Sequence, residues 1–182
     1  MESLQNVIEI LDLEEIEQNH YRAVSPNEGW QRVYGGQVIG QALVAAAKTV
    51  APERHAHSLH GDFLRGGDTS VPILYRVDRI RDGRSFTTRR VEAIQHGRPI
   101  FTMSISFQVD EQGLEHQFDA PIAPDPDSLP DEDELRRAQS VDWPDEFKEN
   151  FNMTSAIQLR QVDPVDLLHP EVKEARQLCW MK

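Results

Sequence analysis

Three histidines, His55, His57 and His60, lie close together in the sequence. The residue pattern that follows His55 predicts a β-strand over 57–64, bounded by Arg65-Gly66-Gly67-Asp68. Side chains of a strand alternate between its two faces, so His57 and His60, an odd number of residues apart, are predicted to lie on opposite faces. One of them would then face the core or a cleft, where an imidazole can act as a general base or form a structural hydrogen bond. A metal site is not expected, because no second group of ligands follows at suitable spacing.

A helix is predicted to start directly after Gly35 and Gly36, at Gln37. The first amides of a helix lack intrahelical partners and carry the positive end of the helix dipole, so they suit a developing oxyanion or a polarised carbonyl. The alternative is that the two glycines only turn the chain and let the helix dock. In the same way, Gln37 could line a cleft or could satisfy backbone groups at the helix start.

The segment from Pro72 to Arg98 is net positive in a chain whose formal net charge is −12. Its basic residues outnumber its three acids and are Arg76, Arg79, Arg81, Arg84, Arg89, Arg90 and Arg98. They form either a solvated hairpin face or a local site for a polyphosphate ligand on an otherwise repelling protein. Nucleic acid and anionic membranes are poor partners for a chain this acidic.

The segment QVIGQALVAAAKTV, residues 37–50, is predicted to be a helix buried nearly all round, because its polar residues form only a thin stripe. Most of its apolar residues are small and let another backbone approach closely, which favours a sheet wrapped around this single helix. An amphipathic helix is predicted near residues 4–11 and a short strand at His20–Ala23. A loop is predicted at Asn27-Glu28-Gly29.

An antiparallel meander is predicted after the long helix. Strands over 72–80 and 98–109 alternate apolar and polar residues, and a strand over 85–95 is joined to them by turns at Asp82-Gly83 and His96-Gly97. Ser85 has no nucleophile-elbow pattern around it, which favours a hairpin residue over a nucleophile.

The composition changes at Asp110 to proline and acidic residues, which predicts a linker with a short helix near 131–139, followed by strands over 157–162 and 176–182. No stretch approaches the roughly 18 apolar residues of a membrane span, so membrane insertion is not expected. The N-terminus does not resemble a signal peptide, and the single cysteine, Cys179, excludes an intramolecular disulfide. These features favour a cytoplasmic location.

Several motifs, in order along the chain, resemble those of the acyl-CoA thioesterase II (TesB-type) family. They include Tyr34-Gly35-Gly36-Gln37-Val38-Ile39-Gly40-Gln41-Ala42, then His57-Ser58-Leu59-His60 with Phe63-Leu64-Arg65 and Gly67-Asp68, and then Arg81-Asp82-Gly83-Arg84-Ser85-Phe86 with Arg89, Val91 and Gln95. The match is collinear over essentially the whole chain. It departs from the family at Gly61-Asp62, where a polar residue and an aromatic are usual, so Asp62 would alter the local pocket or face solvent.

The resemblance implies an α+β hotdog fold, an antiparallel sheet wrapped around a long central helix, as the first half of a double hotdog. Residues 1–110 would form the N-terminal hotdog domain, 111–150 an acidic proline-rich linker, and 151–182 the truncated start of the second domain. The implied activity is hydrolysis of fatty acyl-CoA to free fatty acid and CoA by an activated water, without cofactor, metal or covalent intermediate. The implied assembly is a homo-oligomer that forms through the hotdog sheets.

In the resembling family an Asp, a Ser or Thr and a Gln activate the water, and all three lie in the second domain, so none is assigned to residues 1–182. The resemblance makes His57 the catalytic candidate of this chain. The substrate-binding candidates are Gly35, Gly36, Gln37, Arg84, Ser85, Phe86 and Arg89.

Two alternatives remain at this point. A hotdog dehydratase would need an acidic partner on the central helix, and residues 37–50 contain no Asp or Glu. A non-catalytic acyl-CoA-binding or assembly module is favoured for this polypeptide by the missing water-activating residues, and without them the chain alone is expected to be inactive.

Overall fold

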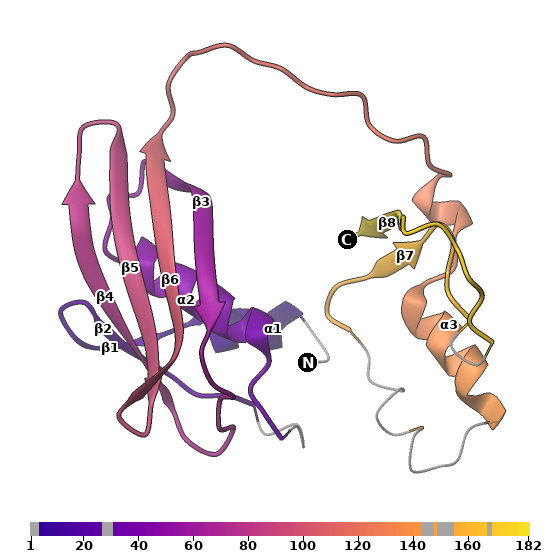
Figure 1. Ribbon diagram of the computed structural model, residues 1–182, viewed down its shortest axis with the longest axis horizontal. Coiled ribbons are helices and arrows are strands. Elements are labelled where there is room, and N and C mark those ends of the chain that lie inside the picture. The colour runs from indigo at the N-terminus through magenta and orange to yellow at the C-terminus, as the bar shows by residue number, and fades with distance from the viewer. Residues whose placement is uncertain (1–3, 27–30, 143–147, 149–154, 167–168) are drawn as a thin grey trace. The chain divides into compact units, whose positions relative to one another are not determined.

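The computed structural model describes the chain apart from residues 1–3, 27–30, 143–147, 149–154 and 167–168, and the loop predicted at 27–29 lies outside the described residues. The chain divides into two compact units, one of Ile8–Leu114 and one made mainly of Glu115–Lys182 (Figure 1). The two units are described separately below.

A six-stranded antiparallel sheet dominates the first unit (Figure 1). Its strands, in spatial order, are β1 (Glu14–Glu17), β2 (His20–Ala23), β4 (Ile73–Asp82), β5 (Phe86–Gln95), β6 (Arg98–Val109) and β3 (Arg54–Phe63). The predicted meander is confirmed, and the predicted strand ends differ from the observed ones by at most three residues. The His96-Gly97 turn has positive φ at both residues, 50° and 70°, as a tight hairpin between twisted strands requires.

The edge strand β1 was not predicted. Its sequence, EEIE, shows no apolar alternation because all four side chains are exposed. The strand forms because Asn19, with φ of 64°, turns the chain back onto β2. Acidic side chains on such an edge discourage pairing with other chains.

The helix α2 (Gly35–Ala47) lies across one face of this sheet (Figure 1). Its buried side chains recur on the face toward the sheet, where Ala42, Ala45 and Ala46 are fully buried and let the backbones approach closely. The prediction of burial nearly all round is wrong for the opposite face, where Ile39 and Leu43 are half-buried and Ala47 is exposed. The reason is that the sheet covers only one side of the helix.

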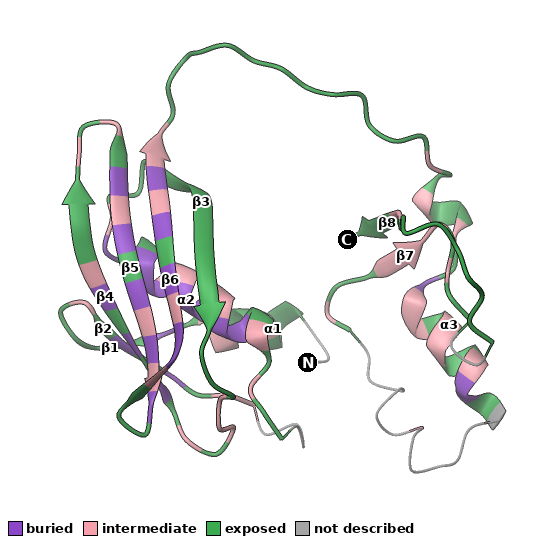
Figure 2. Cartoon of the chain, viewed as in Figure 1, coloured by how far each residue is buried: buried purple, intermediate pink, exposed green. Residues whose placement is uncertain are grey.

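The core is built from the inward-facing residues of the central strands (Figure 2). On β4 these are Ile73, Tyr75 and Val77, and on β6 they include Phe101, Met103, Ile105 and Phe107, all at most 3% exposed. The alternating pattern predicted for both strands is confirmed, and it fixes which side chains face α2 and which face outward.

The strand β3 differs from the central strands of the sheet because nearly all of its side chains are exposed (Figure 2). It is the edge strand beyond β6, and among the described residues it pairs with β6 alone. A β-bulge between Ala56 and Ser58 adds one residue to its register with β6. Such an extra residue shifts the alternation of every side chain on one side of it.

The second unit holds the predicted short helix and two predicted strands. The helix α3 (Glu132–Gln139) is capped by Asp131, whose side chain accepts a hydrogen bond of 2.8 Å from the Asp133 amide. The strands β7 (Leu159–Gln161) and β8 (Cys179–Met181) pair antiparallel. Two 3-10 turns, Pro126–Ser128 and Ser140–Asp142, flank α3.

The helix α1 (Leu4–Leu11) matches the predicted amphipathic helix. Among the described residues, no helix is both long enough and apolar enough to cross a membrane.

Candidate functional site at the start of the central helix

A pocket of about 420 Å³ opens beside the first turn of α2. Its apolar lining comes from the segment before α2, from α2 itself, from the end of β3 and from the start of β6, and consists of Val33, Val38, Phe63, Leu64, Ile100 and Phe101. Two arginines, Arg32 and Arg65, complete the lining together with Gly35, Gly66 and Gly67. The pocket can therefore hold an apolar chain next to an anionic group.

Glycines bring the walls of this pocket into contact. A Cβ atom on Gly35 would lie 2.8 Å from Cζ of Phe63, so the phenylalanine ring packs directly on the helix start. A Cβ on Gly67 would lie 3.0 Å from Cβ of Val33, whose amide donates a hydrogen bond of 3.0 Å to the Gly67 carbonyl. The Gly66-Gly67 pair thus lets two separate segments run side by side.

The loop after β3, which forms one wall of the pocket, is held by side chains of the β5–β6 turn. The Asp68 amide donates to Gln95 Oε1, and Gln95 Nε2 donates to the Asp68 carbonyl, both at 2.8 Å. Asp68 Oδ1 accepts from the amide and the hydroxyl of Ser70, at 2.8 and 2.6 Å, and Asp68 Oδ2 lies 3.0 Å from His96 Nε2. These bonds, led by that from the Ser70 hydroxyl, lower the pKa of Asp68 to about 2, so this loop is anchored by a carboxylate that stays ionised at neutral pH.

Both predicted glycines lie inside the helix, not before it, because α2 begins at Gly35. Gly35 lines the pocket, whereas Gly36 lies beside the exposed ring of Tyr34. Tyr34 is the N-cap residue and its side chain caps no amide. The first amides of the helix are therefore left available at this end of the pocket.

Gln37 points into the core and does not line the pocket. Its Nε2 donates to Ser25 Oγ at 3.0 Å and to Gln41 Oε1 at 3.4 Å. Gln41 in turn donates to the Ile10 carbonyl and accepts from the Tyr75 hydroxyl. Gln37 belongs to this buried network, which ties the N-terminal segment to the helix.

Three other predicted substrate-binding residues, Arg84, Ser85 and Phe86, lie at the opposite end of the sheet. Phe86 pairs with Gln108 of β6, whereas the pocket is lined by Phe101 of the same strand. Seven residues of strand separate these positions by roughly 23 Å. The hydroxyl of Ser85 donates to Glu111 Oε1 at 2.7 Å. This bond agrees with the expectation that Ser85 is a residue of the hairpin and not a nucleophile.

Arg89 is a correction to the predicted phosphate site. Its side chain is 1% exposed and donates to Asp82 Oδ1 at 2.5 Å and to both oxygens of Thr49. The sequence suggested an exposed arginine, but Arg89 is in phase with the buried positions of β5, such as Val91 and Ala93, so its guanidinium faces inward.

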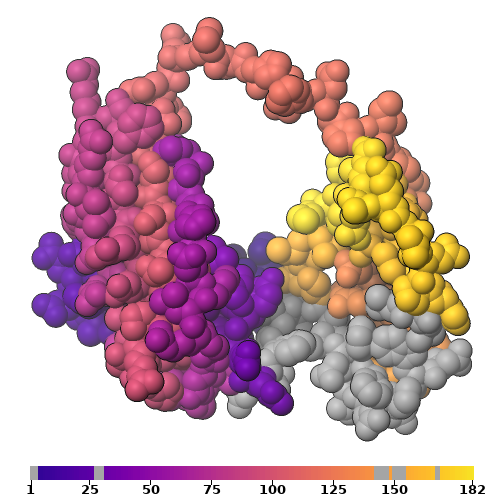
Figure 3. Space-filling view, viewed as in Figure 1, coloured from indigo at the N-terminus to yellow at the C-terminus, as the bar shows by residue number. Residues whose placement is uncertain are grey.

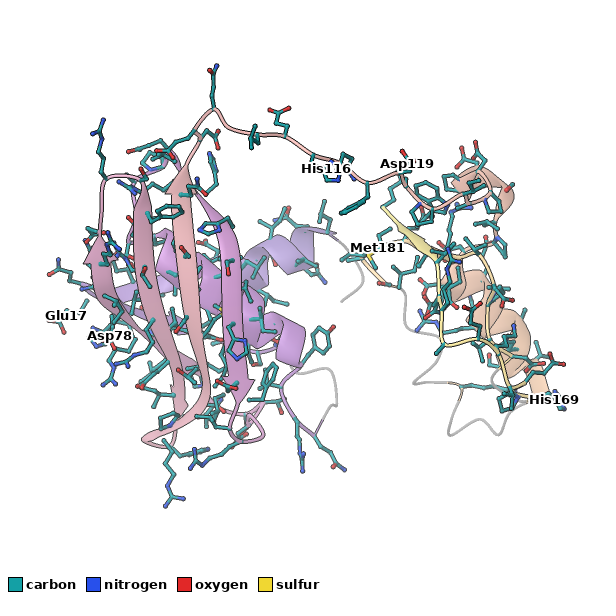
Figure 4. All side chains as sticks on the ribbon, turned by 45° about the horizontal axis from the view of Figure 1, so that its top comes forward. Glu17, Asp78, His116, Asp119, His169 and Met181 are labelled. Atoms are coloured by element: carbon teal, nitrogen blue, oxygen red, sulfur yellow. The ribbon has the colours of Figure 1, made fainter. Side chains whose placement is uncertain are left out.

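Three other arginines of this hairpin have side-chain partners within the first unit, whose strands are drawn from indigo to magenta in Figure 3. Arg76 lies 2.5 Å from Glu92, Arg90 lies 2.7 Å from Asp78, and Arg79 donates to Asn19. Asp78 is labelled in Figure 4. These partners cancel much of the positive charge that the sequence placed on this stretch, which leaves a solvated, ion-paired face.

His57 and His60 lie on the same face of the sheet, so the prediction of opposite faces is wrong. The bulge at Ala56/Ser58 changes the alternation between them. His57 Nε2 lies 2.8 Å from Ser106 Oγ, and its ring packs edge-on against Phe86, with centroids 5.7 Å apart. His60 is exposed on this outer face, and its Nε2 lies 3.9 Å from Asp62.

Sequence reasoning missed Arg32 as a pocket residue and noted Arg65 only within a motif. No spacing pattern marks Arg32, because it precedes the helix in an irregular segment. The available signal was the Gly66-Gly67 pair, since adjacent glycines outside a hairpin turn indicate close approach of another segment.

Comparison with known proteins agrees with this architecture. Residues 25–108 match the family described as the acyl-CoA thioesterase N-terminal domain. Acyl-coenzyme A thioesterase 8 of Mus musculus is 38% identical over 187 residues, which cover 97% of this chain and 58% of that protein. The chain thus spans a little under three fifths of the length of this relative.

Two solved structures are similar over 97% of this chain. The acyl-CoA thioesterase II TesB2 of Mycobacterium marinum is 44% identical, with a TM-score of 0.71 over 59% of its own chain. A conserved protein with a hot dog fold from Alicyclobacillus acidocaldarius has a TM-score of 0.75 at 18% identity over 62% of its chain, and this likeness shows the fold. Residues 25–108 thus match the N-terminal domain of acyl-CoA thioesterases, and the chain as a whole is similar to a type II member of that family with the hotdog fold.

Proposed function

We propose that this chain takes part in the hydrolysis of fatty acyl-CoA thioesters to free fatty acid and CoA, and so in fatty acid metabolism. The observation that supports the proposal is the apolar pocket at the start of α2, in a domain of a thioesterase family. The amides of the first turn, at Gly35 and Gly36, which the described side chains leave uncapped, would polarise the thioester carbonyl, and the apolar lining would contact the uncharged part of the substrate next to it.

The groups that activate water are proposed to come from a second hotdog domain. The described residues that line the pocket include no Asp, Glu or His, so they offer no ordinary general base. His57 lies on the outer face of the sheet and bonds Ser106, which supports a structural role there. Residues 151–182 are proposed to begin the second domain, after a linker over 111–150.

The same absence of a base supports one alternative, in which residues 1–182 bind acyl-CoA without hydrolysing it. Both functions need the pocket, and only hydrolysis needs the second set of groups. A missing oxyanion donor alone typically lowers turnover about a hundred- to a thousand-fold, so loss of the whole water-activating set should leave little activity.

Two measurements on the purified chain test the proposal. The first is calorimetric binding of a thioether analogue of a long-chain acyl-CoA, which cannot be hydrolysed. We expect binding that Phe63→Ala weakens and Phe86→Ala does not, because Phe63 lines the pocket and Phe86 lies on the outer face. Absence of binding, or equal losses in both variants, would contradict a site at this pocket.

The second measurement is hydrolysis of medium- and long-chain acyl-CoA, with the TesB2 protein of Mycobacterium marinum as the reference. Binding with turnover far below the reference is the expected result. Comparable turnover would place the catalytic groups in residues 1–182, and His57→Ala beside His60→Ala would then be the first variants to compare.

Assembly and location follow as parts of the same proposal. The unpaired edge of β3 supports a homo-oligomer formed through the sheets. The described cysteine, Cys179, is free, which supports a reducing compartment such as the cytoplasm.

A further inference from the structure

Four described arginines of the first unit are neutralised by a nearby carboxylate, and the two that line the pocket are not among them. Arg22 pairs with Glu14, Arg89 with Asp82, and the outer-face arginines with the acids named above. Within the described part of the chain, Arg32 and Arg65 have no carboxylate partner. On a protein with a formal net charge of −12, they form a local positive region.

The positions of both guanidinium groups are set by their surroundings. Arg65 Nη1 donates to the Pro99 carbonyl at 2.6 Å, which leaves most of its donors free. The side chain of Arg32 lies across Gly66, where a Cβ atom would come within 3.1 Å of Arg32 Cδ. Arg32 therefore reaches the pocket because position 66 carries no side chain.

We propose that Arg32 and Arg65 form an anion subsite that binds a phosphate group of CoA, while the apolar lining contacts the uncharged pantetheine arm. The inference rests on the proposed function and assigns one end of the pocket to one part of the substrate. Guanidinium groups bind phosphate through paired, charge-assisted hydrogen bonds. A fatty acid product also carries an anion, its carboxylate, and the experiment separates the two sources.

This assignment replaces the predicted phosphate site on the β4–β5 hairpin. Arg89 is buried there, and Arg76 and Arg90 are paired with acids. Arg84 has no side-chain partner among the described residues but lies at the far end of the sheet from the pocket. Arg84 is for that reason the matched control, an equally unpaired arginine outside the subsite.

The test is isothermal calorimetry on the 182-residue chain with CoA, pantetheine and octanoate as ligands. Arg32→Gln and Arg65→Gln should each weaken CoA binding by at least about tenfold, the usual range for a hydrogen bond to a charged group. Pantetheine binding should be unchanged. Arg32→Lys should retain part of the affinity, and Arg84→Gln all of it, while the salt dependence of CoA binding should weaken only in the pocket variants.

Several outcomes would overturn the subsite. One is CoA affinity unchanged in both pocket variants, and another is an equal loss in Arg84→Gln. Preferential loss of octanoate binding would assign the arginines to the carboxylate instead.

Because Arg65→Gln also removes the bond to Pro99, Arg65→Lys and a melting curve of each variant separate lost charge from lost folding. If the wild-type chain binds neither CoA nor acyl-CoA analogues, the proposed function fails, whereas arginine-independent CoA binding would refute the subsite alone.

Discussion

The guanidinium of Arg89 donates hydrogen bonds to both oxygens of Thr49, from Nε to Oγ1 at 2.8 Å and from Nη2 to the carbonyl at 3.1 Å. Thr49 lies just beyond the end of α2, where helix carbonyls lack intrahelical partners. Arg89 Nη1 also donates to the carbonyls of Arg81 and Thr88. One buried arginine thus joins the end of the helix to β4 and β5.

Replacing Arg89 with Met should therefore change stability more than ligand binding. Methionine keeps much of the volume but leaves buried oxygens of Thr49 without donors, at about 1–3 kcal/mol for each unsatisfied group. We expect the free energy of unfolding, measured by urea denaturation, to fall by about 2–4 kcal/mol. The control is Arg90→Met, since exposed pairs such as Arg90–Asp78 contribute about 0–1 kcal/mol. Similar losses in both variants would argue against the buried network.

The Tyr75 hydroxyl donates to Gln41 Oε1 at 2.7 Å inside the core, and its removal gives a second prediction. Tyr75→Phe should lower the free energy of unfolding by about 1 kcal/mol, because Gln41 Oε1 keeps only the longer bond from Gln37. Tyr21→Phe is the matched control, since Tyr21 is also buried and none of the described hydrogen bonds involves its hydroxyl. A neutral effect at Tyr75, or an equal effect at Tyr21, would contradict the role given to this bond.

The same tyrosine predicts a loss of stability in alkali. Burial raises the pKa of the Tyr75 phenol above its ordinary value of 10.0, so the folded chain keeps this proton while the unfolded chain releases it. The contribution is therefore complete below pH 10 and is lost as the pH rises toward the folded-state pKa. Melting temperatures measured above pH 10 should fall less steeply in Tyr75→Phe than in the wild type.

The sequence predicted the central meander well because apolar alternation records burial directly. Every second residue of β6 from Phe101 to Phe107 faces the core, and these residues are apolar while those between them are polar or small, so the alternation is visible in the sequence. The long helix was recognised in the same way, from its small apolar residues. The partly exposed face of α2 could not be predicted, because the sequence of residues 37–50 does not show how far the sheet extends around the helix.

The sites were predicted less well, for two physical reasons. Alternation assumes an unbroken register, and the bulge in β3 moved His57 onto the face of His60. A charged residue type suggests exposure, and Arg89 is buried because Asp82 and Thr49 satisfy it. The pocket itself joins segments before α2 and after β3, and their contact depends on tertiary packing.

Asp68 gives a prediction for acid conditions. Hydrogen bonds from Ser70, first its hydroxyl and then its amide, together with the contact to His96, lower the pKa of Asp68 from 3.8 to about 2. The stabilisation is present above pH 4 and is lost as the pH falls through about 2, because protonation weakens these bonds. Asp68→Asn should therefore melt at a lower temperature at pH 5, and its melting temperature should vary less than that of the wild type between pH 4 and 2.

The control for this prediction is Asp78→Asn, which removes an exposed carboxylate paired with Arg90 on the outer face. Amide hydrogen exchange adds a local measurement. The loop from Leu64 to Val71 should exchange faster in Asp68→Asn, and the strand β4 should not. Equal protection of the loop in wild type and variant would show that Gln95 alone holds it.

The exposed edge of β3 predicts self-association of the chain. In the part of the chain that the structure describes, this strand pairs only with β6, which leaves the backbone groups on its other side open. Leu59 and Phe63 are 44% and 57% exposed on this strand. Open strands with apolar side chains pair with other chains, and a lysine on such a strand opposes this pairing. We expect sedimentation velocity to show dimers or larger species as concentration rises, and Leu59→Lys to shift the distribution toward monomer.

Leu74→Lys is the matched control, because Leu74 is also 44% exposed but lies on β4, which has a neighbour on each side. Equal shifts in both variants would point to general loss of hydrophobic surface, and a wild-type monomer at all concentrations would refute association through this edge.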